Sequence, residues 1–314
     1  MADNPRVHTI LGAGGVIGSE LCSILDARRR VRVVSRNPPS VNGAERIAAD
    51  VSDLDQTVRA VAGSSVVYLV VGLKYDVDVW RELWPKIMRN AIEGCKRADA
   101  SLVFFDNVYM YGRVTGPMTE TTPFNPCSRK GEIRARVATA LIDEMNAGRI
   151  RALIARAADF YGPAARTSVA NILVFDPLAK GAKASWLVDD RVAHSFTFTP
   201  DAAASVAMLA ESDAAWQQTW HLPTAPKPPT GRELVRMVAN EFKVERRLRV
   251  LGRGMLGVAG LFNGDVRELR EVLYQYDAPY VFDSTKFVSA FGVEPTSYAA
   301  GVRQTAAAYQ ARSR

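Results

Sequence analysis

Three glycines at positions 12, 15 and 18 constrain the fold of this chain more than any other feature. They follow a short apolar run that begins at Val7 and precede a helix-like stretch from Ser19 to Ala27. The first glycine allows a tight turn, the second lets the backbone approach a pyrophosphate, and the third allows close packing of the helix. Free N–H groups at the helix N-terminus then bind the phosphates. The pattern predicts a dinucleotide site that includes Gly12, Gly15, Val16, Ile17 and Gly18.

The second apolar run, Val31 to Val34, predicts the strand that ends beside the adenosine ribose. An NAD-specific protein places a carboxylate there to bind the ribose hydroxyls, but this sequence has Ser35 followed by Arg36. An arginine side chain binds a 2′-phosphate well, and the missing carboxylate removes a repulsive charge. We therefore expect NADP as the cofactor in preference to NAD. In the alternative interpretation, Arg36 is a solvated charge at the end of a strand.

Two further pairs of residues follow predicted strands and are expected near the cofactor. Asp50 and Val51 come after the short apolar stretch at 47–49, and we expect them to contact the adenine. Val71 and Gly72 end the fourth apolar run, and we expect them to line the wall beside the ribose. Both predictions depend on position alone, because any strand that passes into a loop gives the same pattern.

Apolar, β-branched runs alternate with helical stretches through the first half of the chain. The further runs are Val66 to Val71, Leu102 to Phe105 and Ile150 to Ile154, and the helical stretches are Asp53 to Ala62, Trp80 to Ala98 and Ile133 to Ala147. This alternation predicts an α/β fold with a Rossmann-like, doubly wound parallel sheet that is covered by helices on both faces.

A smaller C-terminal substrate lobe is expected to accompany the dinucleotide-binding domain. The regular alternation fades after Arg156, and a proline-rich stretch at 223–229 precedes a helix that starts with the capping box of Thr230 and Glu233. The predicted Rossmann domain spans residues 1–170 and is rejoined by about 192–223, whereas residues 171–191 and 224–314 form the predicted substrate-binding lobe.

Composition excludes several classes of protein. The three cysteines, Cys22, Cys95 and Cys127, have neither a paired nor a metal-ligand spacing, and the three histidines are far apart, so we expect reduced thiols and no metal. No apolar run reaches the length of a membrane span, and we expect a soluble, cytoplasmic protein without a membrane partner. The formal net charge of +7 is spread along the chain, and its densest cluster, Glu245 to Arg249, is short. A solvated face or a site for a small anion is expected there in preference to nucleic acid.

The stretch from Gly254 to Phe262 is apolar and glycine-spaced, and it lies in the predicted substrate lobe. Two interpretations stay open. The stretch walls a pocket for an apolar substrate, or it belongs to the interior of the lobe or to a subunit contact.

Five segments resemble, in order, the motifs of the extended short-chain dehydrogenase/reductase family, the group of nucleotide-sugar epimerases, dehydratases and related reductases. The segments are GAGGVIG at 12–18, MYG at 110–112, RAADFYGP at 156–163, FTFTPDA at 196–202, and FDSTK at 282–286 with GVEP at 292–295. They are similar to the family's GxxGxxG, VYG, RPxxxYGP, FxxVDDV, and DxSK with LGWxP. The resemblance covers nearly the whole chain and implies a seven-stranded Rossmann-like domain, a substrate lobe, and a homodimer through two helices of the nucleotide domain.

The resemblance also implies a tyrosine and a lysine, spaced YxxxK on one helix, that act with a nearby serine or threonine. This chain departs from that pattern, because alignment with the family's NPY segment puts Cys127 at the tyrosine position and Gly131 at the lysine position. A register shifted by one restores Lys130 but puts Pro126 at the tyrosine position. The hydroxyl position carries Asn107.

Tyr109 and Tyr111 are the nearest candidates for a replacement acid. As an extension of the preceding strand, Asn107, Tyr109 and Tyr111 would share one face. Asn107 would then bind a carbonyl while one tyrosine acts as the acid. Alternatively, Tyr111 is a packed aromatic residue, and the thiol of Cys127 is a small buried group. Lys130 either reaches the cofactor or is a solvated charge.

Two residues are expected to contact the substrate, Tyr161 in the RAADFYGP segment and His194 before the FTFTPDA segment. His194 stands where nucleotide-sugar enzymes of the resembling family commonly have an arginine suited to a pyrophosphate. Its presence argues against a nucleotide sugar, unless it is only a histidine at the edge of a strand.

Three functions are consistent with these features. The favoured one is an NADP-dependent oxidoreductase that acts on a carbonyl or alcohol of a small metabolite with an atypical proton donor. The second is a nucleotide-sugar-type epimerase or dehydratase that keeps its cofactor bound. The third, supported by the missing YxxxK pair, is a non-catalytic NADP-binding sensor or regulatory protein.

Overall fold

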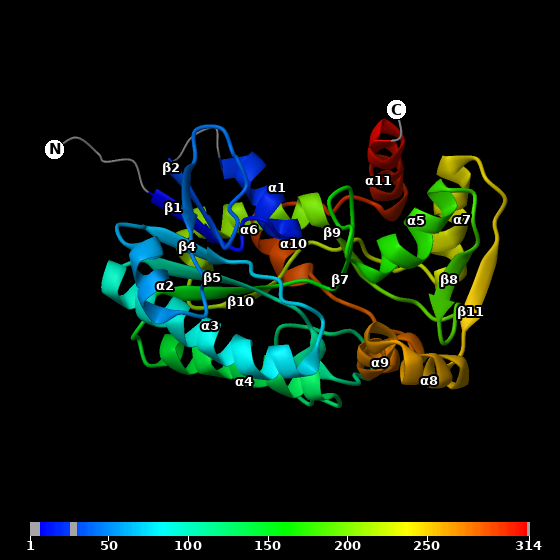
Figure 1. Ribbon diagram of the computed structural model, residues 1–314, viewed down its shortest axis with the longest axis horizontal. Helices are drawn as coiled ribbons and strands as arrows, with labels where there is room; N and C mark the ends of the chain where they lie inside the picture. The colour runs from blue at the N-terminus through cyan, green and yellow to red at the C-terminus, as the bar shows by residue number, and fades with distance from the viewer. Residues whose placement is uncertain (1–6, 26–29, 313–314) are drawn as a thin grey trace. The chain divides into compact units, whose positions relative to one another are not determined.

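The computed structural model describes residues 7–25 and 30–312, which fall into two compact units (Figure 1). Unit 1 comprises Met1–Asp106, Glu132–Arg156 and Ala202–Trp220, and unit 2 comprises Asn107–Gly131, Ala157–Asp201 and His221–Arg314. The division expected from the sequence, with residues 1–170 and about 192–223 in the nucleotide domain, stays a prediction about domains and differs from this grouping by packing.

Unit 1 is built on a seven-stranded sheet with the strand order β10-β6-β5-β4-β1-β2-β3. The strands are β1 (Val7–Leu11), β2 (Arg30–Ser35), β3 (Glu45–Ala48), β4 (Val66–Leu69), β5 (Ser101–Asp106), β6 (Ala152–Arg156) and β10 (Thr219–His221). The pairings from β3 through β6 are parallel. This order is that of a doubly wound Rossmann-like sheet and confirms the predicted fold class.

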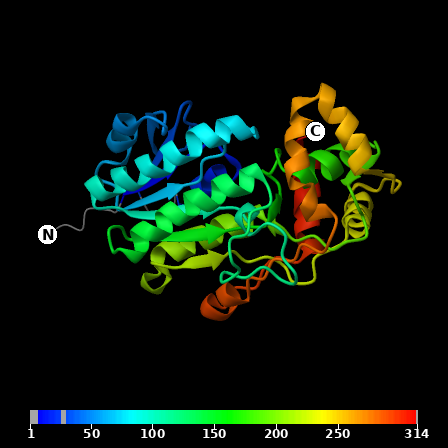
Figure 2. The same cartoon turned by 90° about the horizontal axis from the view of Figure 1, so that it is seen from below.

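Helices cover both faces of this sheet (Figures 1 and 2). On one face lie α1 (Val16–Leu25) and α6 (Thr199–Glu211), and on the other lie α2 (Leu54–Val61), α3 (Val77–Ala98) and α4 (Arg129–Asn146). The central strands are therefore screened from water on both sides, which explains why all of β4 and β6 is buried.

The longest helix of unit 1, α3, is bounded by recognisable signals. Asp76 caps α3 because its carboxylate accepts hydrogen bonds from the N–H groups of Asp78 and Val79. The helix ends at Asp99 in the left-handed conformation, with φ 51°. Trp84 on its inner face lies under the guanidinium of Arg134 from α4, 4.2 Å from the ring centroid. These contacts fix α3 and α4 side by side.

Unit 2 has its own core, in which helices surround two short parallel strand pairs. The pairs are β7 (Asp159–Tyr161) with β9 (Phe196–Phe198) and β8 (Ala184–Leu187) with β11 (Leu248–Leu251). The helices are α5 (Asp176–Ala179), α7 (Gly231–Phe242), α8 (Arg253–Phe262), α9 (Gly264–Leu269), α10 (Thr285–Phe291) and α11 (Tyr298–Arg312). Shorter turns are η1 (Tyr109–Tyr111), η2 (Asn171–Phe175) and η4 (Arg270–Tyr276) here, and η3 (Asp213–Ala215) in unit 1. The predicted capping box of Thr230 and Glu233 opens α7.

Candidate functional site

The glycine turn between β1 and α1 has a backbone that only glycine adopts readily. Gly12 has φ 98°, and its N–H donates to the carbonyl oxygen of Val34 on β2 at 2.9 Å. A Cβ at Gly12 would lie 2.7 Å from the Cα of Val71. The turn therefore packs directly against the chain that leaves β4, and the ends of β1, β2 and β4 meet at this point.

The start of α1 is equally close to the turn. A Cβ at Gly18 would lie 2.4 Å from the carbonyl oxygen of Gly12, so the third glycine is needed for close packing of the helix. The bond from Ser19 N–H to the Gly15 carbonyl, at 2.9 Å, is the first of the helical ladder. The N–H groups of Val16, Ile17 and Gly18 therefore have no acceptor within the helix and face outward at its positive end. This backbone fits the phosphates of a dinucleotide.

Polar side chains gather where β2 and β3 end. Among the described residues, the buried hydroxyl of Ser35 has no hydrogen-bond partner. Arg36 beside it is exposed. Asp50 accepts hydrogen bonds from the N–H and hydroxyl of Ser52, at 2.9 and 2.7 Å, and these bonds lower the pKa of its carboxyl, helped by the charge of Arg36. A ligand hydroxyl or phosphate would satisfy Ser35, so these residues fit the adenosine side of a dinucleotide.

The other residues expected near the cofactor lie at the same edge of the sheet. The carbonyl of Val51 accepts hydrogen bonds from the side chains of Thr57 and Asn90, both at 3.1 Å, which anchor this loop to α2 and α3. Val71 is half-buried against the glycine turn. Gly72 is exposed, with nothing within 4 Å of a Cβ built on it. Both pairs thus flank the turn from the carboxyl ends of β3 and β4.

The segment after β5 does not continue as an extended strand, so the prediction of one shared face for Asn107, Tyr109 and Tyr111 was wrong. Tyr109 and Tyr111 belong to the 3-10 turn η1, because the Asn107 Oδ1 accepts from Tyr109 N–H at 3.1 Å and Val108 carbonyl accepts from Tyr111 N–H at 3.1 Å. The side-chain carbonyl of Asn107 is thus used to cap the turn. Tyr109 remains half-buried.

Tyr111 is a packed residue of unit 2. It is fully buried, and its hydroxyl is 2.8 Å from Nε2 of His221. The Nδ1 of His221 faces the carbonyl oxygen of Asp283 at 2.8 Å, so Nδ1 carries the proton and Nε2 accepts from the tyrosine. The hydroxyl is therefore engaged inside the core, which favours the packing interpretation of Tyr111 over a role as the acid.

The position of the family's lysine is closed to any side chain. A Cβ at Gly131 would lie 2.6 Å from the carbonyl oxygen of Tyr109 and 3.1 Å from the Cβ of Pro126. Cys127, at the tyrosine position, is exposed at the residue level, and partial burial of its thiol raises the pKa above its usual range. The structure has therefore adapted to the loss of the pair, and the thiol is protonated at neutral pH.

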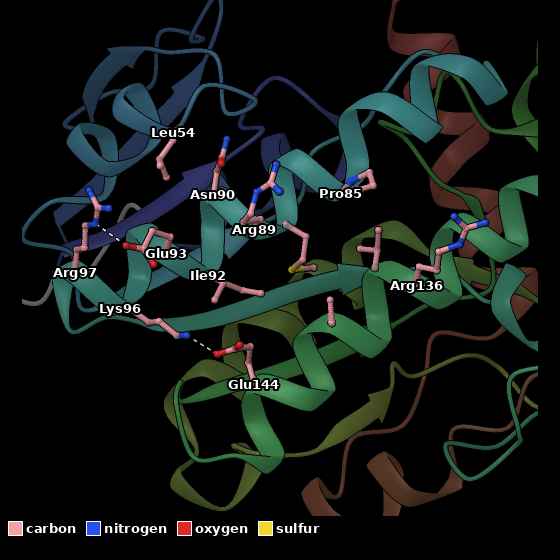
Figure 3. Close-up of a pocket in the computed structure, with 13 residues that line it drawn as sticks. Leu54, Pro85, Arg89, Asn90, Ile92, Glu93, Lys96, Arg97, Arg136 and Glu144 are labelled. Carbon is pink, nitrogen blue, oxygen red and sulfur yellow. Dashed lines mark hydrogen bonds and ion pairs between the residues drawn. The ribbon is translucent and has the colours of Figure 1, made fainter.

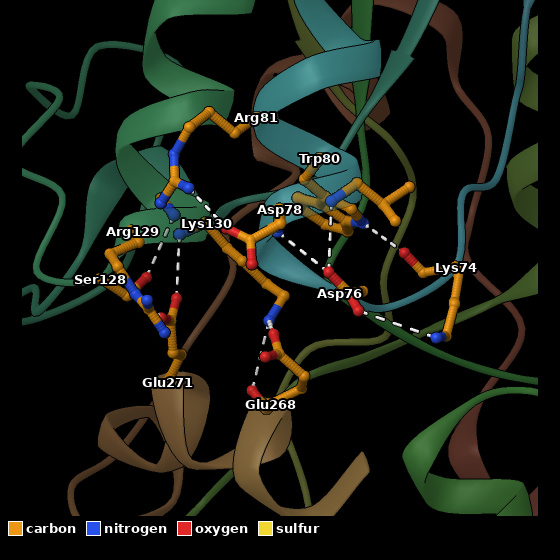
Figure 4. Close-up of polar contacts among 12 residues, drawn as sticks. Lys74, Asp76, Asp78, Trp80, Arg81, Ser128, Arg129, Lys130, Glu268 and Glu271 are labelled. Atoms are coloured by element: carbon orange, nitrogen blue, oxygen red, sulfur yellow. Dashed lines mark hydrogen bonds and ion pairs between the residues drawn. The ribbon is translucent and has the colours of Figure 1, made fainter. Parts of the chain in front are cut away.

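Lys130 is held by acidic residues of unit 2 (Figure 4). Its side chain is fully buried, and its ammonium donates to the carboxylate of Glu268 on α9. Its backbone N–H donates to Glu271 at 3.0 Å, and Glu271 also pairs with the guanidinium of Arg129. A buried ammonium is stable only with such a partner. In this geometry the Lys130 ammonium is paired with Glu268, which does not favour the interpretation of Lys130 as a solvated charge.

Tyr161 and His194, the residues expected at the substrate, are both buried in unit 2. The ring of Tyr161 packs against Phe198 and Tyr298, with centroids 5.3 and 5.9 Å away, and burial raises the pKa of its hydroxyl. His194 is enclosed by aromatic rings and presents Nδ1 to the carbonyl of Gln275 at 3.1 Å. Neither side chain reaches the surface in this structure.

Asp159 lies beside the aromatic rings that enclose His194, and its carboxylate is partly exposed to solvent. Its Oδ2 accepts from Nε2 of His194 and from the hydroxyl of Tyr276, both at 3.0 Å, and its side chain is 17% exposed. Both ring nitrogens of His194 thus lie within hydrogen-bond distance of oxygens, the Gln275 carbonyl at Nδ1 and the Asp159 carboxylate at Nε2. Burial is the main cause of the raised pKa values of Tyr276 and Tyr280. An electrostatic interaction with the Tyr109 side chain raises both further, so Tyr109 lies in the same neighbourhood.

Sequence reasoning missed Asp159 and Tyr276. Their side chains meet although they are separated by 117 positions, and neither lies in a spacing that signals chemistry. The one available signal is the acidic residue inside the RAADFYGP segment, a segment in which the family motif points to the tyrosine.

A groove of about 740 Å³ lies between α3 and α4 in unit 1, away from the glycine turn (Figure 3). Its walls carry the ion pairs of Arg97 with Glu93, at 2.7 Å, and of Lys96 with Glu144. Hydrogen bonds from Arg149 and Lys96 lower the pKa of Glu144 to about 2.

Within the described residues, no group of three or more histidine, cysteine, aspartate or glutamate side chains could hold a metal ion. The described helices include none that is long and apolar enough to cross a membrane.

The fold and the glycine turn define a nicotinamide-dinucleotide-binding protein of the Rossmann-like class. Comparison with known families gives a match to the NAD dependent epimerase/dehydratase family over residues 8–220. The chain therefore belongs to this family of extended short-chain dehydrogenases/reductases. No curated protein matches the chain significantly.

Solved structures match the fold over almost the whole chain. DesIV, a dTDP-glucose 4,6-dehydratase from Streptomyces venezuelae with NAD bound, is 18% identical, covers 97% of each chain and has a TM-score of 0.80. The UDP-glucose 4-epimerase of Thermus thermophilus, in complex with NAD, is 18% identical with a TM-score of 0.79, covering 97% of this chain and 99% of that one. The UDP-glucuronic acid 4-epimerase of Bacillus cereus, in complex with NAD, is 15% identical with a TM-score of 0.79, covering 98% and 100%. These TM-scores and coverages establish the shared fold.

Proposed function

We propose that the chain is an NADP-dependent oxidoreductase that acts on a carbonyl or alcohol of a small metabolite. The observation that carries the proposal is the turn from Gly12 to Gly18, with its crowded glycines and outward-facing N–H groups. When bound, the nicotinamide cofactor supplies or accepts the hydride. The other steps fall to side chains of this chain.

The preference for NADP rests on the end of β2. Ser35 and Arg36 stand where a carboxylate would bind the ribose hydroxyls of NAD, and the partnerless Ser35 hydroxyl is a donor for a phosphate oxygen. The named relatives have NAD bound, so the preference concerns this chain alone. Arg36 also lies near Asp50, because its positive charge helps to lower the pKa of that carboxyl, after the hydrogen bonds from Ser52.

Tyr109 is the proposed proton donor. In the reducing direction, the Tyr109 hydroxyl would give its proton to the carbonyl oxygen as that oxygen becomes an alcohol, and solvent would return a proton to the phenolate. Support comes from its place two residues after Asn107 and from its half-buried side chain. Tyr111, the other candidate, has its hydroxyl engaged by His221.

Asp159 is the proposed anchor for the substrate. The donors His194 and Tyr276 hold one carboxylate oxygen, and the partly exposed group can accept a hydrogen bond from a substrate hydroxyl or amine. A carboxylate disfavours a phosphate at the same place by charge repulsion. This chemistry favours a substrate whose recognised group is a hydrogen-bond donor.

A second candidate is an epimerase or dehydratase that acts on a nucleotide sugar and keeps NAD bound. Membership of the family and the named relatives favour it, because those relatives are described as acting on dTDP- or UDP-sugars. Such an enzyme would use the cofactor transiently, without net consumption of NADPH.

The experiment is calorimetric titration of the cofactor-free protein with NADPH and NADH, followed by an absorbance assay of NADPH consumption on a carbonyl panel. Preferential NADPH binding with turnover supports the oxidoreductase. NAD retained through purification, with conversion of a nucleotide sugar, supports the second candidate. NADPH binding without any turnover overturns both enzymes in favour of a sensor, and no binding overturns the dinucleotide site.

Two further expectations belong with this function. A homodimer through two helices of the nucleotide domain is implied by the family resemblance, and we propose that the two are α3 and α4, which border the groove. The cysteines Cys22, Cys95 and Cys127 are thiols, which is consistent with a reducing, cytoplasmic compartment. Light scattering checks the first expectation, and a monomer at micromolar concentration contradicts it.

A further inference from the structure

We propose that helix α8 and the arginine-rich segments on either side of it dock unit 2 on a membrane surface that carries anionic lipid headgroups. The apolar part, called the α8 face below, consists of Met255, Val258, Leu261 and Phe262. It joins two sequence features that the oxidoreductase chemistry leaves unused, the apolar stretch at 254–262 and the basic cluster at 245–249.

The α8 face is the main apolar surface among the described residues. Eight large hydrophobic side chains are exposed in the described part of the chain, and four of them belong to this face. Exposure rises along it from 54% at Met255 through 61% at Val258 and 75% at Leu261 to 87% at Phe262. Scattered single apolar residues need no explanation, but a contiguous group marks an interaction site.

Helix α8 is apolar on both sides. Leu256 and Gly260 are buried, and a Cβ at Gly260 would lie 3.3 Å from atoms of Arg267 and Arg270, so this side packs against α9 and η4. Met255, Val258 and Phe262 repeat at the helical period on the opposite side. No charged residue occurs from Gly254 to Phe262. A helix of this composition is stable in a surface position only when its second side is also covered.

Basic residues border the α8 face. The segment from Lys243 to Arg270 holds seven basic and three acidic residues, a net charge of +4 in a chain with +7 overall. Two of the acids are already neutralised, Glu245 by Arg247 at 2.7 Å and Glu268 in its buried pair. Within the described chain, the exposed side chains of Arg246, Arg267 and Arg270 have no carboxylate partner. The surface therefore combines the apolar α8 face with positive charges that have no carboxylate partner among the described residues.

The combination of exposed apolar side chains and positive charge indicates which partner binds the α8 face. A second copy docked through the same face would bring two sets of arginines together, since a two-fold interface pairs a patch with itself. A bilayer with anionic lipids instead accepts the apolar side chains at the headgroup boundary and attracts the arginines. At ten residues, α8 is about 15 Å long, which suits a helix that lies in the interface plane and not one that spans it.

The test is flotation of the full chain with vesicles of phosphatidylcholine alone or with added phosphatidylglycerol. We expect co-flotation only with the anionic vesicles and its loss at high salt. The double variant Leu261→Glu/Phe262→Glu should lower the bound fraction at least about tenfold, because each side chain loses its apolar burial and adds a repelled charge. The matched control Ile172→Glu changes an exposed apolar residue of unit 2, 48% exposed, and should leave binding unchanged.

Tryptophan fluorescence and two checks of the fold complete the test of membrane binding. A Phe262→Trp variant should show a blue shift of its fluorescence with anionic vesicles, because the indole enters the headgroup region. NADPH affinity and circular dichroism of each variant check that the fold is kept. Binding that survives Leu261→Glu/Phe262→Glu, equal binding to neutral vesicles, or a dimer in light scattering that this double variant abolishes without any vesicle binding would each overturn the membrane proposal.

Discussion

A side chain on Gly18 and the carbonyl oxygen of Gly12 cannot occupy the same space, since a Cβ there would lie 2.4 Å from that oxygen. We therefore expect Gly18→Ala to push α1 away from the turn and to cost about 1–3 kcal/mol of unfolding free energy. The displaced N–H groups should also weaken NADPH binding. Gly14→Ala is the matched control, because nothing lies within 4 Å of a Cβ at that position. Calorimetry and chemical denaturation measure both effects, and unchanged NADPH affinity in Gly18→Ala would argue against a phosphate site at this helix.

The choice between NADPH and NADH is expected to depend on Arg36. If its guanidinium binds the 2′-phosphate, Arg36→Ala should raise the Kd for NADPH at least about tenfold, as a charge-assisted hydrogen bond contributes about 1.5–3 kcal/mol. The Kd for NADH should not change. Arg59→Ala removes another exposed arginine of unit 1 and controls for the loss of net charge. Equal weakening of both cofactors would refute the phosphate assignment.

Tyr109 and Tyr111 offer a matched pair of phenylalanine substitutions. Tyr109→Phe should lower kcat about 100-fold or more, in the range of general acid catalysis, with NADPH affinity unchanged. Tyr111→Phe removes the buried partner of His221 and should lower stability by about 1–3 kcal/mol while activity per folded molecule is kept. Steady-state kinetics and denaturation separate the two. Full activity in Tyr109→Phe removes it as the acid.

The Glu144 carboxylate should make stability depend on acid pH. Because Arg149 and Lys96 lower its pKa from 4.5 to about 2 in the folded state, its contribution is present above about pH 4.5 and is lost as the pH falls toward 2. Both the carboxylate and its partners are partly exposed, so solvent screening keeps the contribution below about 1 kcal/mol. Glu144→Gln should flatten the stability curve between these pH values. An unchanged curve would mean that the ion pairs are not formed in solution.

The parts of this protein that could be predicted from sequence are those fixed by local physics. Gly12 needs a positive φ, Gly18 needs close packing, and the capping box of Thr230 and Glu233 satisfies backbone donors within three residues. Each requirement restricts the residue type at its own position, so the residue type predicts the local backbone conformation there. The alternating apolar runs predicted the sheet for the same reason, since strands buried on both faces must be apolar throughout.

The parts that could not be predicted depend on distant partners. Whether the chain after Asn107 extends or turns is decided by its packing, including the contact of Tyr111 with His221, 110 positions away. The closure of Gly131 against Tyr109 likewise appears only in three dimensions. The apolar stretch at 254–262 has the same pattern whether it is buried or exposed, and four of its side chains proved to be exposed.

The buried pair of Lys130 and Glu268 gives a prediction that distinguishes a structural lysine from a cofactor ligand. Lys130→Met leaves a carboxylate buried without its cation and should cost about 3–5 kcal/mol, and Glu268→Leu should cost a similar amount. The double variant should lose far less than the sum of both, because a packed apolar pair replaces the ion pair. Lys86→Met, which breaks the exposed pair with Glu82, should cost less than about 0.5 kcal/mol and serves as the control.

NADPH affinity of the same variants decides the role of Lys130. A lysine that acts only through Glu268 leaves NADPH affinity unchanged in the double variant, where the fold is restored. A lysine that binds the cofactor loses affinity in both Lys130→Met and the double variant, whatever the stability. Denaturation and calorimetry on the four proteins therefore give one of two distinct patterns. Strictly additive stability losses would show that the two charges do not interact in solution.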